Sequence, residues 1–208
     1  MEILTIFLLA LAAVQTRVTS LKTAIYVLLV QSVLVAGACL VVALETREMH
    51  TYIAALLTAV IKAGVIPFAL LRLSGRLKRE KEQHPMLGPN TASLAACVAI
   101  FFAYTLIDHA LPGVVSRDSL AAAITLVMIG LLLIMTRHQA ILQTVGLITM
   151  ENGIYLVGLS VTQGLPLIIE MGIFLDVLVA VLVLVILTYR LKLSFASTDT
   201  SVLEELKG

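Results

Sequence analysis

Long apolar runs follow one another along this chain, separated by charged residues or by Pro and Gly. A helix needs about 20 apolar residues to cross the hydrocarbon core of a bilayer, so each run is a candidate membrane span. The predicted spans are residues 2–16, 21–44, 51–73, 92–111, 119–136, 139–162 and 165–190. The sequence therefore predicts an all-α fold, a polytopic transmembrane helix bundle of about seven helices.

The composition agrees with a protein whose main solvent is lipid. Of the 208 residues, 60% are hydrophobic and 13% are charged, whereas a soluble domain has about 25% charged residues. The net charge of +1 argues against a nucleic-acid partner. Cys39 and Cys97 each lie alone in an apolar run, which predicts small buried side chains and no metal or disulfide site. The lipid bilayer is the first partner that the sequence predicts.

The distribution of positive charge tests the helix count, because cytoplasmic connections are enriched in Lys and Arg. When the N-terminus is placed outside, one set of connections holds most of the basic residues and the other set holds only Arg47 and Arg117. The first set contains Arg17, Lys22, Arg72, Arg76, Lys78, Arg79, Lys81, Arg137, Arg190, Lys192 and Lys207. The predicted topology is N-terminus out and C-terminus in.

The predicted helices form two groups. Residues 1–118 hold four of them and a basic cytoplasmic loop at 74–91, and residues 119–208 hold three followed by a polar C-terminal tail. The first span is short, so Gln15 and Arg17 are expected to lie at the membrane interface or to extend their side chains towards it. The basic loop is either solvated or docks on a partner subunit or anionic lipid, and the sequence leaves both open.

Three ionisable side chains lie well inside predicted spans: Lys62, Glu151 and Asp176. A charge at the centre of a spanning helix costs about 2.5–3.5 kcal/mol on insertion scales, so each one needs a structural or functional reason. Lys62 lies near the middle of its span. Glu151 precedes Gln163 by 12 residues and Asp176 follows it by 13. Across the short turn at Gln163, both carboxylates therefore stand about 18–20 Å from the turn, at one depth.

Carboxylates at one depth on adjacent helices can exchange protons through a water molecule or a hydroxyl group. We therefore predict a proton relay of Lys62, Glu151 and Asp176, with Glu170, nearer the outer interface, as its candidate entrance. The alternative is a structural ion pair between Lys62 and one of the carboxylates, which would hold helices together. The sequence leaves open which carboxylate Lys62 meets.

Other side chains are predicted to support this region. Pro67 has no N–H for the carbonyl four residues before it, which predicts a kink or a water-binding site beside the intramembrane lysine, or an ordinary packing bend. Asn152, Tyr155 and Thr149 are expected to hydrate or hydrogen-bond the region of Glu151. The glycines of the sixth span are expected to allow close helix approach; they are Gly146, Gly153 and Gly158.

Three segments carry a resemblance to a known family: VIKAGVIP at 60–67, VGLITMENGIYLVGLS at 145–160 and PLIIEMGIFLDVLVAVLVLV at 166–185. With these, the chain resembles the membrane subunit called component E of hydrogenase-4-type complexes, which are group 4 nickel–iron hydrogenases. Its last three helices are similar to subunit K of respiratory complex I and to the C subunit of multi-subunit sodium/proton antiporters. In the complex I subunit a glutamate directly follows a Gly-Leu pair, whereas here Glu151 stands about one helix turn further on. Asp176 stands where that subunit has a glutamate.

The resemblance implies a non-redox membrane-arm subunit of a complex I-related assembly that couples electron transfer to the movement of protons or sodium. No catalytic centre or cofactor is expected in this chain, and nickel–iron and iron–sulfur centres would belong to partner subunits of an oxidoreductase complex. Antiporter-like and other membrane subunits are the expected partners, in a bacterial or archaeal cytoplasmic (inner) membrane. The alternatives are a structural scaffold subunit of the same complex or of a multi-subunit cation/proton antiporter, and an autonomous transporter.

Overall fold

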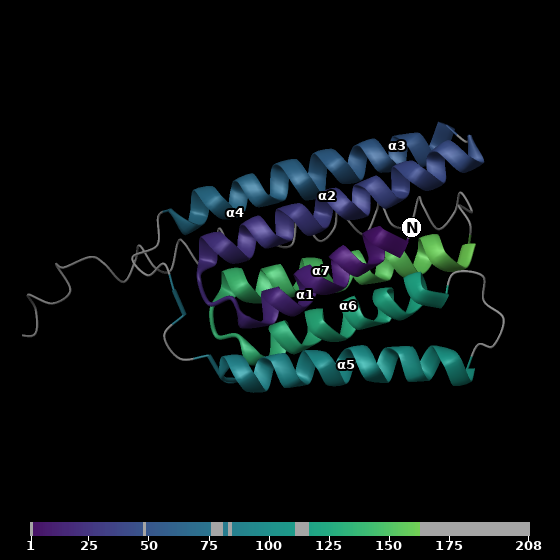
Figure 1. Cartoon of the computed structure of the whole chain (residues 1–208). Helices are drawn as coiled ribbons and strands as arrows, with labels where there is room; N and C mark the ends of the chain where they lie inside the picture. Colours follow the sequence, from purple (N-terminus) through teal and green to yellow (C-terminus); the bar gives the residue numbers. More distant parts are fainter. Residues whose placement is uncertain (1, 48, 76–80, 83–84, 111–116, 163–208) are drawn as a thin grey trace, which may run out of the picture.

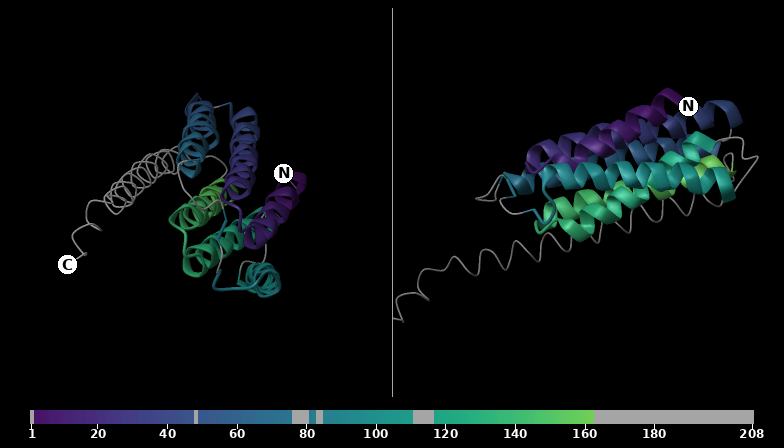
Figure 2. Two further views of the ribbon diagram at one scale, coloured as in Figure 1. Left: turned by 90° about the vertical axis from the view of Figure 1, so that its left-hand side faces the viewer. Right: turned by 60° about the horizontal axis from the view of Figure 1, so that its bottom comes forward.

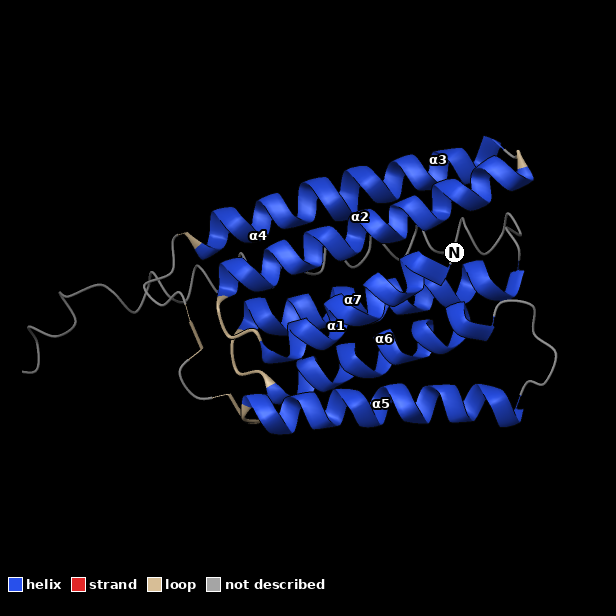
Figure 3. Cartoon of the chain, in the orientation of Figure 1, coloured by secondary structure: helices blue, strands red, loops and turns tan. Residues whose placement is uncertain are grey.

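The computed structural model describes residues 2–47, 49–75, 81–82, 85–110 and 117–162. Within these residues every regular element is a helix, as Figure 3 shows. The predicted span at 165–190 and the polar tail lie outside the described residues, and so do Glu170 and Asp176. The all-α fold class is confirmed for the described part, while the count of seven helices and the membrane orientation stay predictions.

The helices lie close to the predicted spans. They are α1 (Glu2–Arg17), α2 (Leu21–Thr46), α3 (Met49–Thr58), the π-helix η1 (Ala59–Val65), α4 (Ile66–Ser74), α5 (Pro89–Ala110), α6 (Arg117–Thr136) and α7 (Ala140–Thr162). Because α3, η1 and α4 are continuous, they form one rod, which we call the third rod. This rod and α2, α5, α6 and α7 are long and apolar enough to cross a membrane, whereas α1 is a shorter apolar helix.

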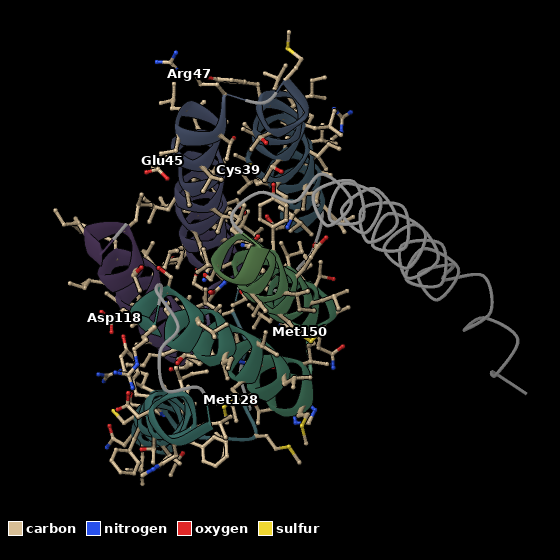
Figure 4. All side chains as sticks on the ribbon, turned by 90° about the vertical axis from the view of Figure 1, so that its right-hand side faces the viewer. Cys39, Glu45, Arg47, Asp118, Met128 and Met150 are labelled. Carbon is tan, nitrogen blue, oxygen red and sulfur yellow. The ribbon has the colours of Figure 1, made fainter. Side chains whose placement is uncertain are left out.

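The rods lie side by side and alternate in direction (Figure 1). The end-on view in Figure 2 places α2 beside the third rod, α6 beside α7, and α5 at the edge of the bundle. One end of the bundle carries the α1–α2, α4–α5 and α6–α7 connections, and we call it the basic end. Its described basic residues are Arg17, Lys22, Arg72, Lys81 and Arg137. The opposite end, seen in Figure 4, carries Arg47 and Arg117.

Helices α6 and α7 pack closely because glycines stand at their contact. A Cβ atom added to Gly146 would lie 2.8 Å from Leu133 Cβ, and one added to Gly153 would lie 2.7 Å from the carbonyl oxygen of Ala123. Both distances are too short for a real Cβ, so the expected role of these two glycines in close approach is confirmed. On α6, Gly130 faces Met150 in the same way; this third glycine was not predicted from the sequence.

The basic end is closed by a buried ion pair between a loop and a helix end. The Arg137 guanidinium lies 2.9 Å from a Glu82 carboxylate oxygen, and both side chains are buried. The other Glu82 oxygen accepts hydrogen bonds from the backbone N–H groups of His138 and Gln139, just before α7 begins. Arg137 also donates to the carbonyl of Thr16 at the end of α1. Of the two alternatives for the loop at 74–91, the solvated loop is therefore wrong at Glu82.

The structure places three further residues, and one expectation about them is wrong. Gln15 is buried, with its side-chain oxygen beside the Thr149 hydroxyl of α7, and its depth relative to the membrane interface stays a prediction. Cys97 is exposed rather than buried, because α5 lies at the edge of the bundle and turns one face away from it. Pro89 is the first residue of α5. Proline suits this position, since the first N–H of a helix has no partner within the helix.

Candidate functional site

The intramembrane lysine lies on a π-helix. Within η1 the hydrogen bonds are wider than in an α-helix, and the N–H of Ile66 bonds to the carbonyl of Ile61, five residues earlier. Pro67 follows directly and has no N–H to bond to Ala63, so a regular α-helical ladder could not pass through this point. The backbone beside Lys62 thus forms a π-helical turn, which the sequence did not predict, while the predicted kink or water-binding site stays a prediction. Such turns occur often at functional sites.

Lys62 reaches from the third rod to α7. Its side chain is fully buried, and Nζ donates a hydrogen bond to Asn152 Oδ1 over 3.2 Å. The nearest Glu151 carboxylate oxygen lies 3.8 Å from Nζ. This distance is within ion-pair range but too long for a hydrogen bond. Asn152 is therefore the direct acceptor, and Glu151 supplies the opposite charge that a buried ammonium group needs.

Tyr155 completes the contact surface of the lysine. Lys62 Nζ lies 5.3 Å from the centre of the Tyr155 ring, within the range of a cation–π interaction. The Tyr155 hydroxyl lies 3.0 Å from Cys39 Sγ on α2. Cys39 Sγ also lies 3.9 Å from the carbonyl oxygen of Thr51 on α3, and Figure 4 shows this cysteine between the two helices. The tyrosine ring is thus held between the lysine and α2.

The site holds two groups of opposite charge in buried surroundings. The Glu151 carboxylate and the Lys62 ammonium group lie 3.8 Å apart. Both residues are buried, since Glu151 is 2% exposed and Lys62 is 0% exposed. In such surroundings the attraction between opposite charges is stronger than in water. Among the described residues, no group of three or more His, Cys, Asp or Glu side chains could hold a metal ion.

The structure brings together four of the predicted site residues: Lys62, Glu151, Asn152 and Tyr155. Pro67 lies on the same rod as the lysine, just beyond η1. The remaining two, Glu170 and Asp176, lie outside the described residues, so the predicted pairing of Asp176 with Glu151 stays a prediction.

Sequence reasoning missed two kinds of contact around this site. The Thr149 hydroxyl contacts Gln15 and Gln31. Gln31 is a polar residue in the middle of an apolar run, and this position alone indicates a buried polar contact. Nothing in the sequence marked Cys39 as the partner of Tyr155, because this contact joins residues 116 positions apart.

Sequence comparison finds relatives of this chain. Over 151 residues, 71% of the chain, it is 32% identical to the uncharacterized protein Rv0085 of Mycobacterium tuberculosis, and the match covers 68% of that protein. Over 151 residues, 72% of the chain, it is 27% identical to hydrogenase-4 component E of Escherichia coli K12 and of Shigella flexneri, and each match covers 70% of the relative. No family model matches the chain, and no solved structure matches it.

Proposed function

Because the chain belongs to the same family as Rv0085 and is a distant homologue of hydrogenase-4 component E, we propose that it is a membrane-arm subunit of a hydrogenase-4-like complex. In this complex, which is related to respiratory complex I, the chain carries no redox centre. Its part is to move protons or sodium ions across the membrane when the partner subunits transfer electrons. The partners are antiporter-like and other membrane subunits, and the nickel–iron and iron–sulfur centres belong to peripheral ones.

The observation that carries this proposal is the burial of Lys62 against Glu151 inside helices that are apolar enough to cross a membrane. A proton that reaches Glu151 converts its carboxylate to a neutral acid. The ammonium of Lys62 then keeps the hydrogen bond to Asn152 but loses the opposite charge beside it. A buried charge without a counter-charge is costly, so the site favours the release of a proton onwards. Asp176 belongs to the same relay, and Glu170, nearer the outer interface, is its candidate entrance.

Glu151→Gln tests the proposal. The glutamine keeps the shape of the side chain but cannot exchange a proton, so the complex should assemble while proton translocation coupled to its redox reaction falls about tenfold or more. The measurement is dye-reported proton uptake by inverted membrane vesicles, with the redox rate followed in parallel. Glu45→Gln is the matched control, because Glu45 is an exposed carboxylate at the far end of α2 (Figure 4). Full translocation in assembled Glu151→Gln complexes would refute the relay.

One observation favours a second function, that of a structural scaffold. The hydrogen bond from Lys62 to Asn152 joins the third rod to α7 and would hold two helices together without any proton transfer.

Lys62→Met separates the two functions. Under the relay proposal, the variant assembles and its coupled proton translocation falls about tenfold, because the charge that modulates Glu151 is gone. Assembly is measured by the recovery of partner subunits after purification in mild detergent. Loss of assembly in Lys62→Met, combined with normal translocation in Glu151→Gln, would favour the scaffold.

A further inference from the structure

A second group of buried polar side chains lies between α1, α2 and α7, apart from the contacts of the lysine. Gln15 is 2% exposed, and Gln31 and Thr149 are each 0% exposed; Ser32, which follows Gln31 on α2, is 0% exposed as well. Thr149 Oγ1 lies 3.1 Å from Gln15 Oε1 and 3.3 Å from Gln31 Oε1. One hydroxyl of α7 therefore joins a glutamine of α1 to a glutamine of α2.

These side chains have more hydrogen-bonding capacity than their neighbours satisfy. The Thr149 hydroxyl has a single proton and also lies 2.8 Å from the carbonyl oxygen of Val145, so it cannot donate to three oxygens. In the described part of the chain, Gln15 Nε2, Gln31 Nε2 and Ser32 Oγ have no hydrogen-bond partner. Buried polar atoms of this kind are commonly satisfied by ordered water, which binds where several polar partners converge.

The position of the group links the basic end to the depth of the lysine. Gln15 directly precedes Thr16, whose carbonyl accepts a hydrogen bond from Arg137 at the basic end. Gln31 follows the start of α2 by ten residues, and Thr149 and Glu151 follow the start of α7 by nine and eleven. At 1.5 Å per residue, these three positions stand about 15, 14 and 17 Å from the basic end. The polar side chains thus extend from near this end to the level of Glu151.

We propose that these side chains line a hydrated path, which leads from the basic end between α1, α2 and α7 to the level of Glu151 and delivers protons there. The destination rests on the proposed function, whereas the path itself is a matter of water access. By the distribution of basic residues, its mouth faces the cytoplasm. The competing arrangement is a dry clamp, in which both glutamine amides donate to the two lone pairs of the Thr149 hydroxyl.

Thiol labelling in the assembled complex distinguishes the path from the clamp. Ser32→Cys and Thr149→Cys are made singly in a full-length chain that carries Cys39→Ser and Cys97→Ser, and are exposed to a small charged methanethiosulfonate. Only a hydrated thiol forms the reactive thiolate, so both positions should label at least about tenfold faster than a dry buried position. The matched control is Thr125→Cys on α6. Thr125 is 0% exposed, and among the described residues its hydroxyl donates within its own helix, to the carbonyl of Ala121.

The sidedness of labelling completes the test. Labelling should be fast in inverted vesicles, where the cytoplasmic face meets the reagent, and slow in right-side-out vesicles. Labelling no faster than in Thr125→Cys, or equally fast from both sides, would overturn the path. Its failure is distinguishable from failure of the relay: fast labelling with full translocation in Glu151→Gln keeps the path and refutes the relay. No labelling, combined with blocked translocation in Glu151→Gln, would refute the path and keep the relay.

Discussion

Gly130→Val is expected to prevent α6 and α7 from packing together and to leave little folded protein in the membrane. A Cβ atom at this position would lie 2.5 Å from the backbone nitrogen of Met150 and 2.7 Å from the carbonyl oxygen of Gly146. Both are backbone atoms of α7, so no side-chain rotation relieves the clash, and the helices must separate. The free energy of unfolding should fall by more than the usual cost of overpacking, which is about 1–3 kcal/mol. Because α7 carries Glu151, the lysine site would be lost as well.

The measurement is the yield of monodisperse protein after extraction in mild detergent, followed by its thermal stability. Gly37→Val is the matched control, because an added Cβ at Gly37 of α2 meets nothing within 4 Å. Both variants carry the same change in helix propensity, so the difference between them reports the packing alone. Equal yields and melting temperatures would show that α6 and α7 do not approach as closely as the glycines indicate.

Arg137→Met is expected to destabilise the protein by about 3–5 kcal/mol, the usual cost of removing one partner of a buried ion pair. The Glu82 carboxylate would remain buried, with only the N–H groups of His138 and Gln139 beside it. The variant also loses the hydrogen bond to the carbonyl of Thr16, which ties the end of α1 to the loop. The measurement is the shift of the unfolding midpoint on titration with a denaturing detergent.

Arg117→Met provides the control at the opposite end of the bundle. Arg117 and Asp108 lie 2.8 Å apart, as close as the buried pair, but their side chains are 47% and 63% exposed. Exposed pairs contribute about 0–1 kcal/mol, so this variant should unfold close to the midpoint of the wild type. Similar losses in both variants would mean that burial is not what makes the Arg137–Glu82 pair important.

The sequence predicted the described helices to within a few residues, because the length of an apolar run is set by the thickness of the membrane. It gave an ion pair between Lys62 and a carboxylate as the alternative to a relay, and in the described part Lys62 Nζ lies 3.8 Å from a Glu151 oxygen. It did not predict that Asn152 would be the direct hydrogen-bond acceptor. Which side chain of α7 comes closest depends on the rotation of one helix against another, and hydropathy does not record this rotation.

Contacts between distant segments were out of reach for the same reason. Glu82 lies in a basic, polar loop, so composition indicated solvent, and only its place beside the start of α7 explains its burial. Gln15 was assigned to the interface because α1 is short. Its burial depends on the neighbouring Thr149, which comes 134 residues later. Such polar contacts follow from which helices are neighbours, and a single sequence does not specify the neighbours.

The π-helical turn of the third rod changes the period at which its buried positions repeat. Thr58, Lys62, Ile66 and Leu70 are all buried, and each follows the previous one by four residues. On a helical wheel drawn at 100° per residue, three such steps would place Leu70 about 120° away from Thr58, towards the lipid. The wider π turn brings the four positions back into phase. A search for this site in other sequences should therefore look for a lysine inside a strict four-residue repeat that ends near a proline, and not for the 3.6-residue period of an ordinary span.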